Sequence, residues 1–148
     1  MRVVVQKVKK ASVSIDNELY SSIKQGYLVL FGAEKGDTIN QADWMANKLS
    51  VLRCFPDENG KMNLSVKDVQ GEMLVVSQFT LCTDIRKGTR PSFDNAMSPK
   101  EAKEMYEYFI SKLQENNIPI KTGVFGAHME VNLLNDGPVT FVIQAPEL

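Results

Sequence analysis

Histidine and cysteine are scarce in this sequence of 148 residues, and their scarcity excludes several kinds of site. His128 is the only histidine, so mechanisms that need two histidines, and most metal sites built on imidazole, are disfavoured. Cys54 and Cys82 lie far apart with no CxxC spacing, which indicates neither a disulfide framework nor a zinc site. We therefore expect a protein without a metal, in a reducing cytoplasm.

Long apolar runs and nucleotide-binding glycine motifs are also missing. No window approaches the ~20 consecutive apolar residues of a membrane span, and segment 1–6 lacks the apolar stretch of a signal peptide. Segment 32–38 lacks the spacing of a P-loop, and no GxGxxG follows a predicted strand. The sequence therefore predicts neither membrane association nor secretion, and no nucleotide cofactor.

The balance of charge gives no general attraction to a polyanion. Lys and Arg number 17 against 18 Asp and Glu, for a net charge of −1, so binding to nucleic acid would need a local patch. A run of charges is most often a solvated loop. Two basic clusters could nevertheless form such a patch: Lys7, Lys9 and Lys10, and Arg86, Lys87 and Arg90.

What is present is the composition of one globular domain, residues 1–148, with 43% hydrophobic and 24% charged residues. Short β-branched and alternating runs dominate, and the apolar run Tyr27–Phe31 predicts a buried central strand. Asn59-Gly60 favours a tight turn before the alternating segment Met62–Val66. Further strands are predicted near residues 3–5, 13–19, 72–81, 129–134 and 139–144.

Two amphipathic helices are predicted. The first begins after Asp37 as N-cap and has apolar positions at helical spacing as far as Leu52. The second begins at Ser98-Pro99-Lys100-Glu101, where an N-cap serine and an N3 glutamate predict a reciprocal capping box, and it ends at Asn116–Asn117. Because strands outnumber helices and do not alternate with them, the predicted class is α+β, with a mixed or antiparallel sheet wrapped toward a barrel.

The segment Ser77–Leu81 is the first candidate site. If the strand that begins at Glu72 continues through it, Gln78 and Thr80 share a face with Leu74 and Val76, and a core face becomes polar at its end. One interpretation is an edge strand whose last residues are solvated. The other is the rim of a pocket, where backbone N–H groups face an oxyanion and the side chains orient a substrate.

The segment Asp136–Val139 is the second candidate site. Asp136-Gly137 between two predicted strands favours a hairpin, yet Pro138 has no N–H to give to the returning strand. The simplest interpretation is a proline at the first residue of an edge strand. Such conflicts between local rules also occur at functional positions.

Residues around His128 offer little chemistry by pattern alone. The histidine precedes a predicted strand with no serine, cysteine or second ligand at a motif spacing, which predicts an exposed or capping residue. Phe125 and Met129 could line a pocket, although apolar residues beside a strand more often belong to the core.

Considered together, Ser77–Leu81 and Asn135–Thr140 resemble the two signature motifs of the D-aminoacyl-tRNA deacylases, in the same order and spacing. The resemblance extends over nearly the whole chain. One departure is Lys7, where the family commonly has an arginine that braces the Gly-Pro turn; lysine keeps the charge but lacks the planar fork. The other matching segments are Gln6, Ala11–Val13, Gly60–Leu64, Arg90–Phe93 and Gly123–Met129.

The resemblance implies a homodimeric hydrolase with a barrel-like sheet and helices outside it. Its substrate would be a D-aminoacyl-tRNA, or glycyl-tRNA, cleaved at the ester on the terminal adenosine in a proofreading step, with no membrane or DNA partner. Ser77, Gln78, Phe79 and Thr80 would form the pocket of one subunit. The remaining implied substrate-binding residues are Gly137 and Pro138, as a cis turn from the partner that rejects L-amino acids, with Met129, Phe125 and Lys7.

Two mechanisms are compatible with this resemblance. An aminoacyl ester is already activated, so backbone N–H groups near Phe79 and Thr80, a positioned water and the 2′-hydroxyl of the RNA would suffice without metal, cofactor or histidine. Thr80 as a covalent nucleophile is the alternative, although neither motif supplies the base it needs. The alternative function is a catalytically idle RNA-binding or dimerisation module of the same fold.

Overall fold

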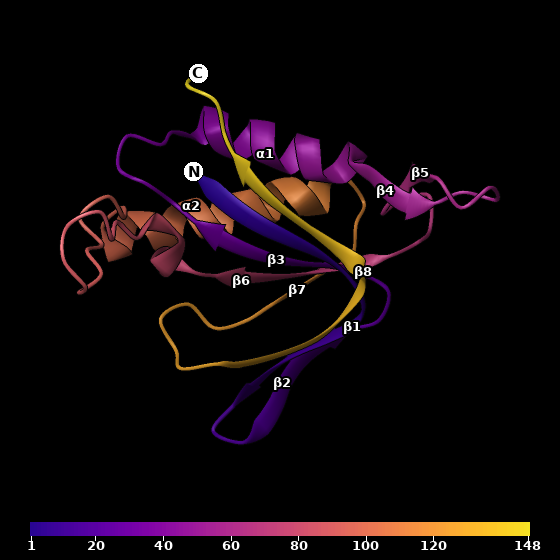
Figure 1. Ribbon diagram of the computed structural model, residues 1–148, viewed down its shortest axis with the longest axis horizontal. Helices are drawn as coiled ribbons and strands as arrows, with labels where there is room; N and C mark the ends of the chain where they lie inside the picture. The colour runs from indigo at the N-terminus through magenta and orange to yellow at the C-terminus, as the bar shows by residue number, and fades with distance from the viewer.

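The computed structural model describes residues 1–148 and combines a twisted sheet with two α-helices on one of its faces (Figure 1). The six-stranded sheet has the order β2-β1-β3-β6-β7, and β8 pairs with the free side of β1. A separate hairpin joins β4 to β5. The elements in chain order are β1 (Arg2–Ile15), β2 (Glu18–Ile23), β3 (Gly26–Gly32), α1 (Ile39–Val51), β4 (Arg53–Pro56), β5 (Met62–Ser65), β6 (Glu72–Ser77), the 3₁₀-helix η1 (Phe79–Cys82), α2 (Pro99–Glu115), β7 (Ile120–Thr122) and β8 (Glu130–Gln144).

The sheet is mixed, and its longest strands wrap it toward a barrel. β1 runs antiparallel to β2, β3 and β8, whereas β3, β6 and β7 are parallel to one another. The first half of β1 lies between β3 and β8, and its second half lies between β2 and β8. This arrangement confirms the predicted α+β class with helices outside a mixed sheet.

β3 and β6 form a layer that is buried on both faces. Alternate residues of β3, such as Val29 and Phe31, pack under the helices in the larger core. The residues between them, such as Leu28, pack with Leu74 and Val76 in a smaller core enclosed by the outer half of β1 and by β2. Burial on both faces explains why these strands are continuous apolar runs rather than alternating ones.

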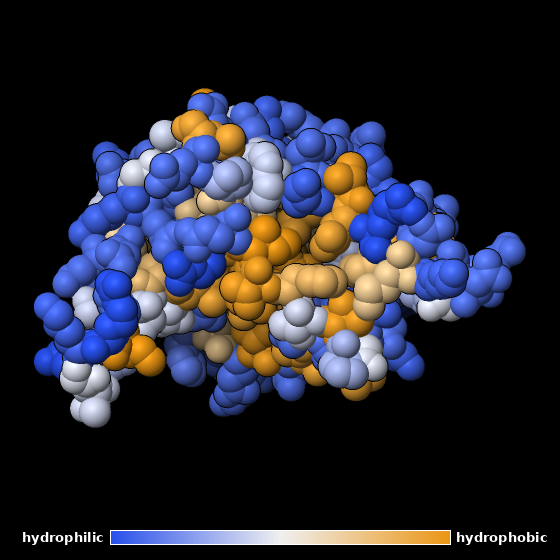
Figure 2. Space-filling view, turned by 45° about the horizontal axis from the view of Figure 1, so that its top comes forward, coloured by the Kyte–Doolittle hydropathy of each residue, from blue (hydrophilic) through white to orange (hydrophobic).

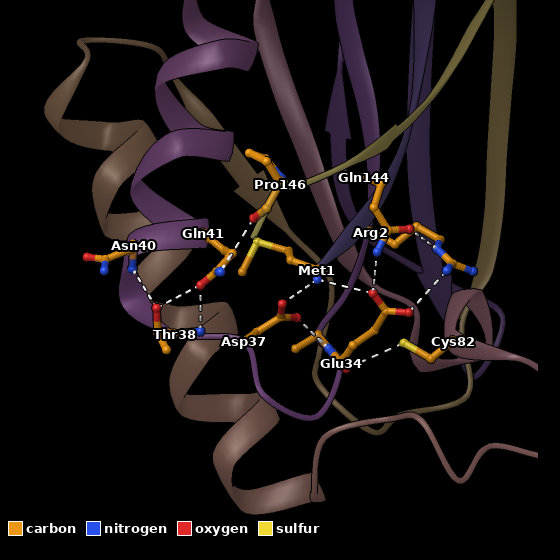
Figure 3. Close-up of polar contacts among 11 residues, drawn as sticks. Met1, Arg2, Glu34, Asp37, Thr38, Asn40, Gln41, Cys82, Gln144 and Pro146 are labelled. Atoms are coloured by element: carbon orange, nitrogen blue, oxygen red, sulfur yellow. Dashed lines mark hydrogen bonds and ion pairs between the residues drawn. The ribbon is translucent and has the colours of Figure 1, made fainter. Parts of the chain in front are cut away.

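The start of α1 differs from the prediction by one residue. Thr38, not Asp37, is the N-cap: its hydroxyl accepts from Asn40 N at 3.3 Å, and Gln41 Oε1 accepts from Thr38 N at 2.8 Å. Asp37 is occupied elsewhere, because its carboxylate accepts from the Met1 ammonium at 2.5 Å and from Glu34 N at 2.6 Å (Figure 3). The ammonium group therefore holds the connection between β3 and α1.

α2 begins after Ser98 as predicted, but the reciprocal capping box does not form. The Ser98 hydroxyl donates to the Glu101 carboxylate at 2.5 Å and caps no backbone N–H. A carboxylate is a stronger acceptor than a neutral group, which favours this direct pair. The predicted apolar stripe is confirmed by the buried side chains of Ala102, Tyr106, Phe109 and Leu113.

Three strand predictions were wrong in detail. β6 ends at Ser77 and the chain turns into η1, so Gln78 and Thr80 do not continue the face of Leu74 and Val76. The two strands predicted after Met129 are one strand, β8. β7 was not predicted at all, since its three residues carry no alternation long enough to detect.

Neither α-helix is long and apolar enough to cross a membrane.

Candidate active site

A pocket of about 240 Å³ opens at the carboxyl end of β6. One wall is the end of β6 with the start of η1, residues Ser77, Gln78 and Phe79. The facing wall is the β7–β8 connection, residues 125–129. The rest of the lining consists of Phe31, Ala33, Val76, Ala102 and Val131. The pocket therefore joins two segments that are distant in the sequence.

The wall at β6 is formed where the ladder stops. Gln78 N still donates to Phe31 O at 2.7 Å, and the chain then bends into η1, where Leu81 N donates to Gln78 O at 3.2 Å. The first N–H groups of a helix have no acceptor inside it, and in η1 these belong to Phe79 and Thr80. Gln78 Nε2 donates to the Thr80 hydroxyl, which fixes the amide relative to η1 although Thr80 is not among the lining residues.

η1 is held from outside the pocket. Arg2 Nη1 donates to Leu81 O at 3.0 Å, and Arg2 pairs with Glu34 at 3.2 Å (Figure 3). On the solvent side, the half-exposed Phe79 ring meets the Phe93 ring edge to face, with ring centroids 5.1 Å apart. These contacts keep the first two residues of η1 in place at the pocket mouth.

The facing wall depends on a close approach of the backbone. A Cβ on Gly123 would lie 2.5 Å from Met129 Sδ, so glycine is needed for the methionine to occupy its place in the pocket. The Phe125 ring lies 6.0 Å from the ring of Tyr106, whose hydroxyl donates to Val75 O at 2.6 Å. Phe125 and Met129 are therefore anchored to the same core as the β6 wall.

The pocket is electrically neutral apart from one residue that can titrate. Its lining includes no Asp, Glu, Lys or Arg, and the exposed His128 is its single histidine. Cys82 is the last residue of η1 and is buried, which raises the pKa of its thiol, and its sulfur contacts Ala33 O at 3.4 Å. Such a thiol is a poor nucleophile. No group of three or more His, Cys, Asp or Glu side chains could hold a metal ion.

The segment around Gly137-Pro138 lies elsewhere in the chain and is not a hairpin. β8 pairs Thr140 with Gln6 and Asn135 with Val8. Residues 136–139, called the excursion here, therefore leave the hydrogen-bonded ladder with β1, and the pairing resumes after them. The Asn135 side chain closes this excursion, since its Oδ1 accepts from Val139 N at 3.0 Å and its Nδ2 donates to Val139 O at 3.1 Å. The Gly137-Pro138 bond is cis, and both residues are exposed.

Lys7 lies under this excursion rather than in the pocket. It is only 8% exposed, its Nζ is 3.9 Å from Asp136 Oδ2, and it lies 5.9 Å from the centre of the Phe55 ring. Lys7 pairs with Tyr27 at one end of β3, whereas the pocket lies at the Phe31 end. Within one chain, Gly137, Pro138 and Lys7 are thus separated from the pocket.

The structure brings five predicted site residues together: Ser77, Gln78, Phe79, Phe125 and Met129. It also places His128 in the lining, which the sequence pattern did not predict because the histidine has no partner at a motif spacing. The glycine two residues earlier, Gly126, lies in a turn of this loop, but it does not single out the histidine.

Comparisons with known proteins agree along the whole chain. A family model described as D-Tyr-tRNA(Tyr) deacylase matches residues 4–144. The D-aminoacyl-tRNA deacylase of Geotalea uraniireducens (strain Rf4) is 51% identical over 147 residues, 99% of this chain and 95% of that protein. The protein of the same name in Geobacter sp. (strain M21) is 52% identical over 146 residues, 99% of this chain and 98% of that protein.

Two solved structures share the fold of this chain. One titled "c-Myc DNA Unwinding Element Binding Protein" has a TM-score of 0.93 and 42% identity, covering 99% of this chain and 100% of that chain. A second, titled "Structural Analysis of a probable eukaryotic D-amino acid tRNA deacylase", has a TM-score of 0.82 at 15% identity, covering 96% and 97%, and supports the fold alone. From the family model and the full-length identities, we conclude that the chain belongs to the D-Tyr-tRNA(Tyr) deacylase family.

Proposed function

We propose that this protein hydrolyses the ester between a D-amino acid, or glycine, and the terminal adenosine of tRNA, as a proofreading step in the cytoplasm. The observation that carries the proposal is the neutral pocket at the end of β6, formed by the segment Ser77–Phe79 in a chain that matches the family from end to end. A small neutral pocket suits an ester that is already activated and needs little side-chain chemistry.

In this mechanism the backbone of η1 stabilises the charge that develops on the carbonyl oxygen. The N–H groups of Phe79 and Thr80 have no acceptor within η1, which leaves them available to an oxyanion. Gln78, whose amide is fixed by Thr80, orients the ester, and Ser77 contributes a hydroxyl to the same wall. Water attacks the carbonyl carbon, the ester bond to the ribose 3′-oxygen breaks, and the 2′-hydroxyl assists the transfer of the proton from the water to that leaving oxygen. The products are the free amino acid and tRNA with a free 3′-hydroxyl.

The proposed enzyme is a homodimer in which Gly137-Pro138 of one subunit enters the pocket of the other. Two observations support this. The excursion is exposed and separated from the pocket of its own chain. In addition, Val4, Leu30 and Val142 lie in register across three neighbouring strands on the face away from the helices, and Val142 is 72% exposed. Figure 2 shows a hydrophobic area near the middle of one face of the molecule, bordered by hydrophilic side chains.

Selection against L-amino acids would be steric. The excursion presents backbone atoms beside the α-carbon of the substrate, where a D-residue or glycine carries hydrogen and an L-residue carries Cβ. The wrong isomer is rejected by collision rather than by recognition of its side chain, so the identity of the D-side chain has little influence. Lys7 and Asp136 support the base of the excursion.

The decisive experiment measures release of free amino acid from the same tRNA charged with D-tyrosine or with L-tyrosine. We expect rapid release from the D-charged tRNA and little from the L-charged tRNA. Equal cleavage of both would exclude the steric filter. Tight binding without any release would favour the idle RNA-binding module. Because the name of one relative assigns a DNA ligand to that protein, duplex DNA is included as a competitor, and we expect no inhibition by it.

A further inference from the structure

A basic loop, defined here as residues 84–92, begins just after η1 and returns to the mouth of the pocket. Its neck is closed by two backbone hydrogen bonds, from Asp84 N to Ser92 O at 2.8 Å and from Ser92 N to Asp84 O at 2.9 Å. The next residue, Phe93, contacts the Phe79 ring at the pocket mouth. The pocket and the basic loop are therefore joined through the contact of Phe93 with Phe79.

The basic loop carries cations that no acidic side chain neutralises. Arg86 is bound to Asp84, with Nη2 to Oδ2 at 2.5 Å and Nε to Oδ1 at 3.0 Å, and this pair lowers the pKa of the Asp84 carboxyl to about 2. Asp84 thus stays ionised and closes the start of the loop. Lys87 and Arg90 are exposed and form no ion pair. They are a local positive charge on a chain whose net charge is −1.

The position of these cations determines which polyanion they can reach. The proposed function places the terminal adenosine at the pocket, so the preceding nucleotides must leave the pocket past its rim. In the other basic cluster, Lys7 is buried and pairs with Asp136 away from the pocket, and the exposed Lys9 and Lys10 are not among the residues that line the pocket. The basic loop is the cationic segment joined to the pocket mouth through the contact of Phe79 with Phe93.

We propose that the basic loop binds phosphates of the 3′ strand of the tRNA, with Lys87 and Arg90 as the contacting residues. This inference rests on the proposed function. Phosphate contacts fix register without reading sequence, so the basic loop would hold the strand for any tRNA and leave amino-acid selection to the pocket. It also explains how a protein without a positive net charge could retain a polyanionic substrate.

The test compares two substrates that differ only in their phosphates. The double variant Lys87→Ala/Arg90→Ala is assayed on D-tyrosyl-tRNA and on 3′-O-D-tyrosyl-adenosine, which has the same ester and no phosphate. We expect KM for the tRNA to rise about tenfold, on the order of 1.4 kcal/mol, while the kinetics on the adenosine ester stay unchanged. The salt dependence of tRNA binding should also weaken, by a slope of roughly 0.7 for each phosphate that the variant no longer binds.

The matched control is Lys61→Ala/Lys67→Ala, which removes the same charge from exposed positions in and beside the β4–β5 hairpin. Figure 1 places that hairpin and the segment before α2 at opposite ends of the long axis. We expect the control to match the wild type on both substrates. A loss for the control equal to that of the double variant would show only a general effect of charge and would overturn the proposal.

Other results separate the two proposals. An unchanged KM for tRNA in the double variant overturns the role of the basic loop, and an equal loss on both substrates assigns the loop a structural role instead. Wild-type protein that cleaves neither substrate would overturn the proposed function. The basic loop is then judged by binding of uncharged tRNA: a salt-dependent loss of affinity in the double variant supports it, and unchanged affinity contradicts it.

Discussion

At the scale of single residues, Gly137 has little freedom to change. A Cβ at this position would lie 2.2 Å from Val139 N and 2.7 Å from Val139 Cγ2, so the excursion must shift to accept one. The Asn135 side chain also holds Val139, because it hydrogen-bonds to both the backbone N–H and the backbone carbonyl of Val139. The backbone of the proposed filter is thus fixed by local contacts that any side chain on residue 137 disturbs.

We expect Gly137→Ala to lower cleavage of D-aminoacyl-tRNA and to raise cleavage of L-aminoacyl-tRNA relative to it. The reason is that the displaced excursion no longer occupies the space where the Cβ of an L-residue would lie. The measurement is the ratio of the two hydrolysis rates, with the unfolding midpoint in urea as the check that the fold is intact. An unchanged ratio in a folded variant contradicts the filter.

Thr80→Ala should retain measurable hydrolysis. The proposed oxyanion contacts are backbone N–H groups, which this substitution leaves in place, whereas the hydrogen bond from Gln78 to the hydroxyl is removed. We expect a decrease of about tenfold, as for one neutral hydrogen bond of about 1 kcal/mol and the looser amide that results. A covalent acyl group trapped on Thr80, or complete inactivity of the folded variant, would restore the nucleophile mechanism.

His128→Ala tests whether the single histidine of the pocket transfers protons. The histidine makes no hydrogen bond within the chain, so nothing orients it as a base. We expect the variant and the wild type to have pH–rate profiles of the same shape between pH 5.5 and 8, a range in which histidine side chains commonly act as bases. An inflection in the wild-type profile that disappears in the variant would make His128 a general base. Incubation of the wild-type protein with a metal chelator should also leave the hydrolysis rate unchanged, because no cluster of side chains in the structure could hold a metal ion.

At the scale of elements, the strongest sequence signals were those that need only local contacts. The apolar run of β3 and the Ser98-Pro99 start of α2 were predictable, because burial and helix initiation are encoded within a few residues. The end of β6 was not, because it depends on Phe31 of a different strand and on Arg2, which holds η1 from β1. The pocket shares this limit, since its two walls meet only in the folded chain.

In the connection between β3 and α1, Asp37 binds the distant Met1 ammonium and does not cap the nearby start of α1. The Met1 ammonium contacts Asp37 and Glu34, and the Asp37 side chain is only 9% exposed (Figure 3). We expect Asp37→Asn to lower the free energy of unfolding by about 2 kcal/mol, because a nearly buried cation loses one of its two carboxylates. Urea unfolding measures the change. Glu58→Gln, at an exposed position, is the control and should have little effect.

At the scale of the whole molecule, the sequence motifs identified both halves of the proposed site but not their separation. Ser77–Phe79 lies beside the Phe31 end of β3, whereas Gly137-Pro138 lies near its opposite end. No local sequence pattern encodes the distance between the two segments. The pairing of β1 with β3 and with β8 shows that the two motifs lie apart within one chain. In the proposed dimer, a complete site would need two subunits, which the sequence of one chain predicts only through resemblance.

Val142→Glu is expected to weaken the proposed dimer and to reduce deacylation in parallel. The side chain is 72% exposed and lies in register with Val4, so a charge there would have to be buried between subunits. Sedimentation velocity and D-tyrosyl-tRNA hydrolysis measure the two effects. Ile39→Glu changes another apolar side chain that is 54% exposed, at the start of α1, and should alter neither. A fully active Val142→Glu monomer would contradict the shared site.

The way in which β8 resumes its pairing after the excursion has a consequence for how the protein can change. Because Asn135 and Thr140 are both paired with β1, residues added or removed between them alter the projection of the segment without moving the strand on either side. Insertions elsewhere in a long strand would shift its register and turn core residues outward. If this segment is the filter that we propose, the stereochemical preference could therefore be varied by length changes at this one place, during evolution or in the laboratory, while the scaffold stays the same.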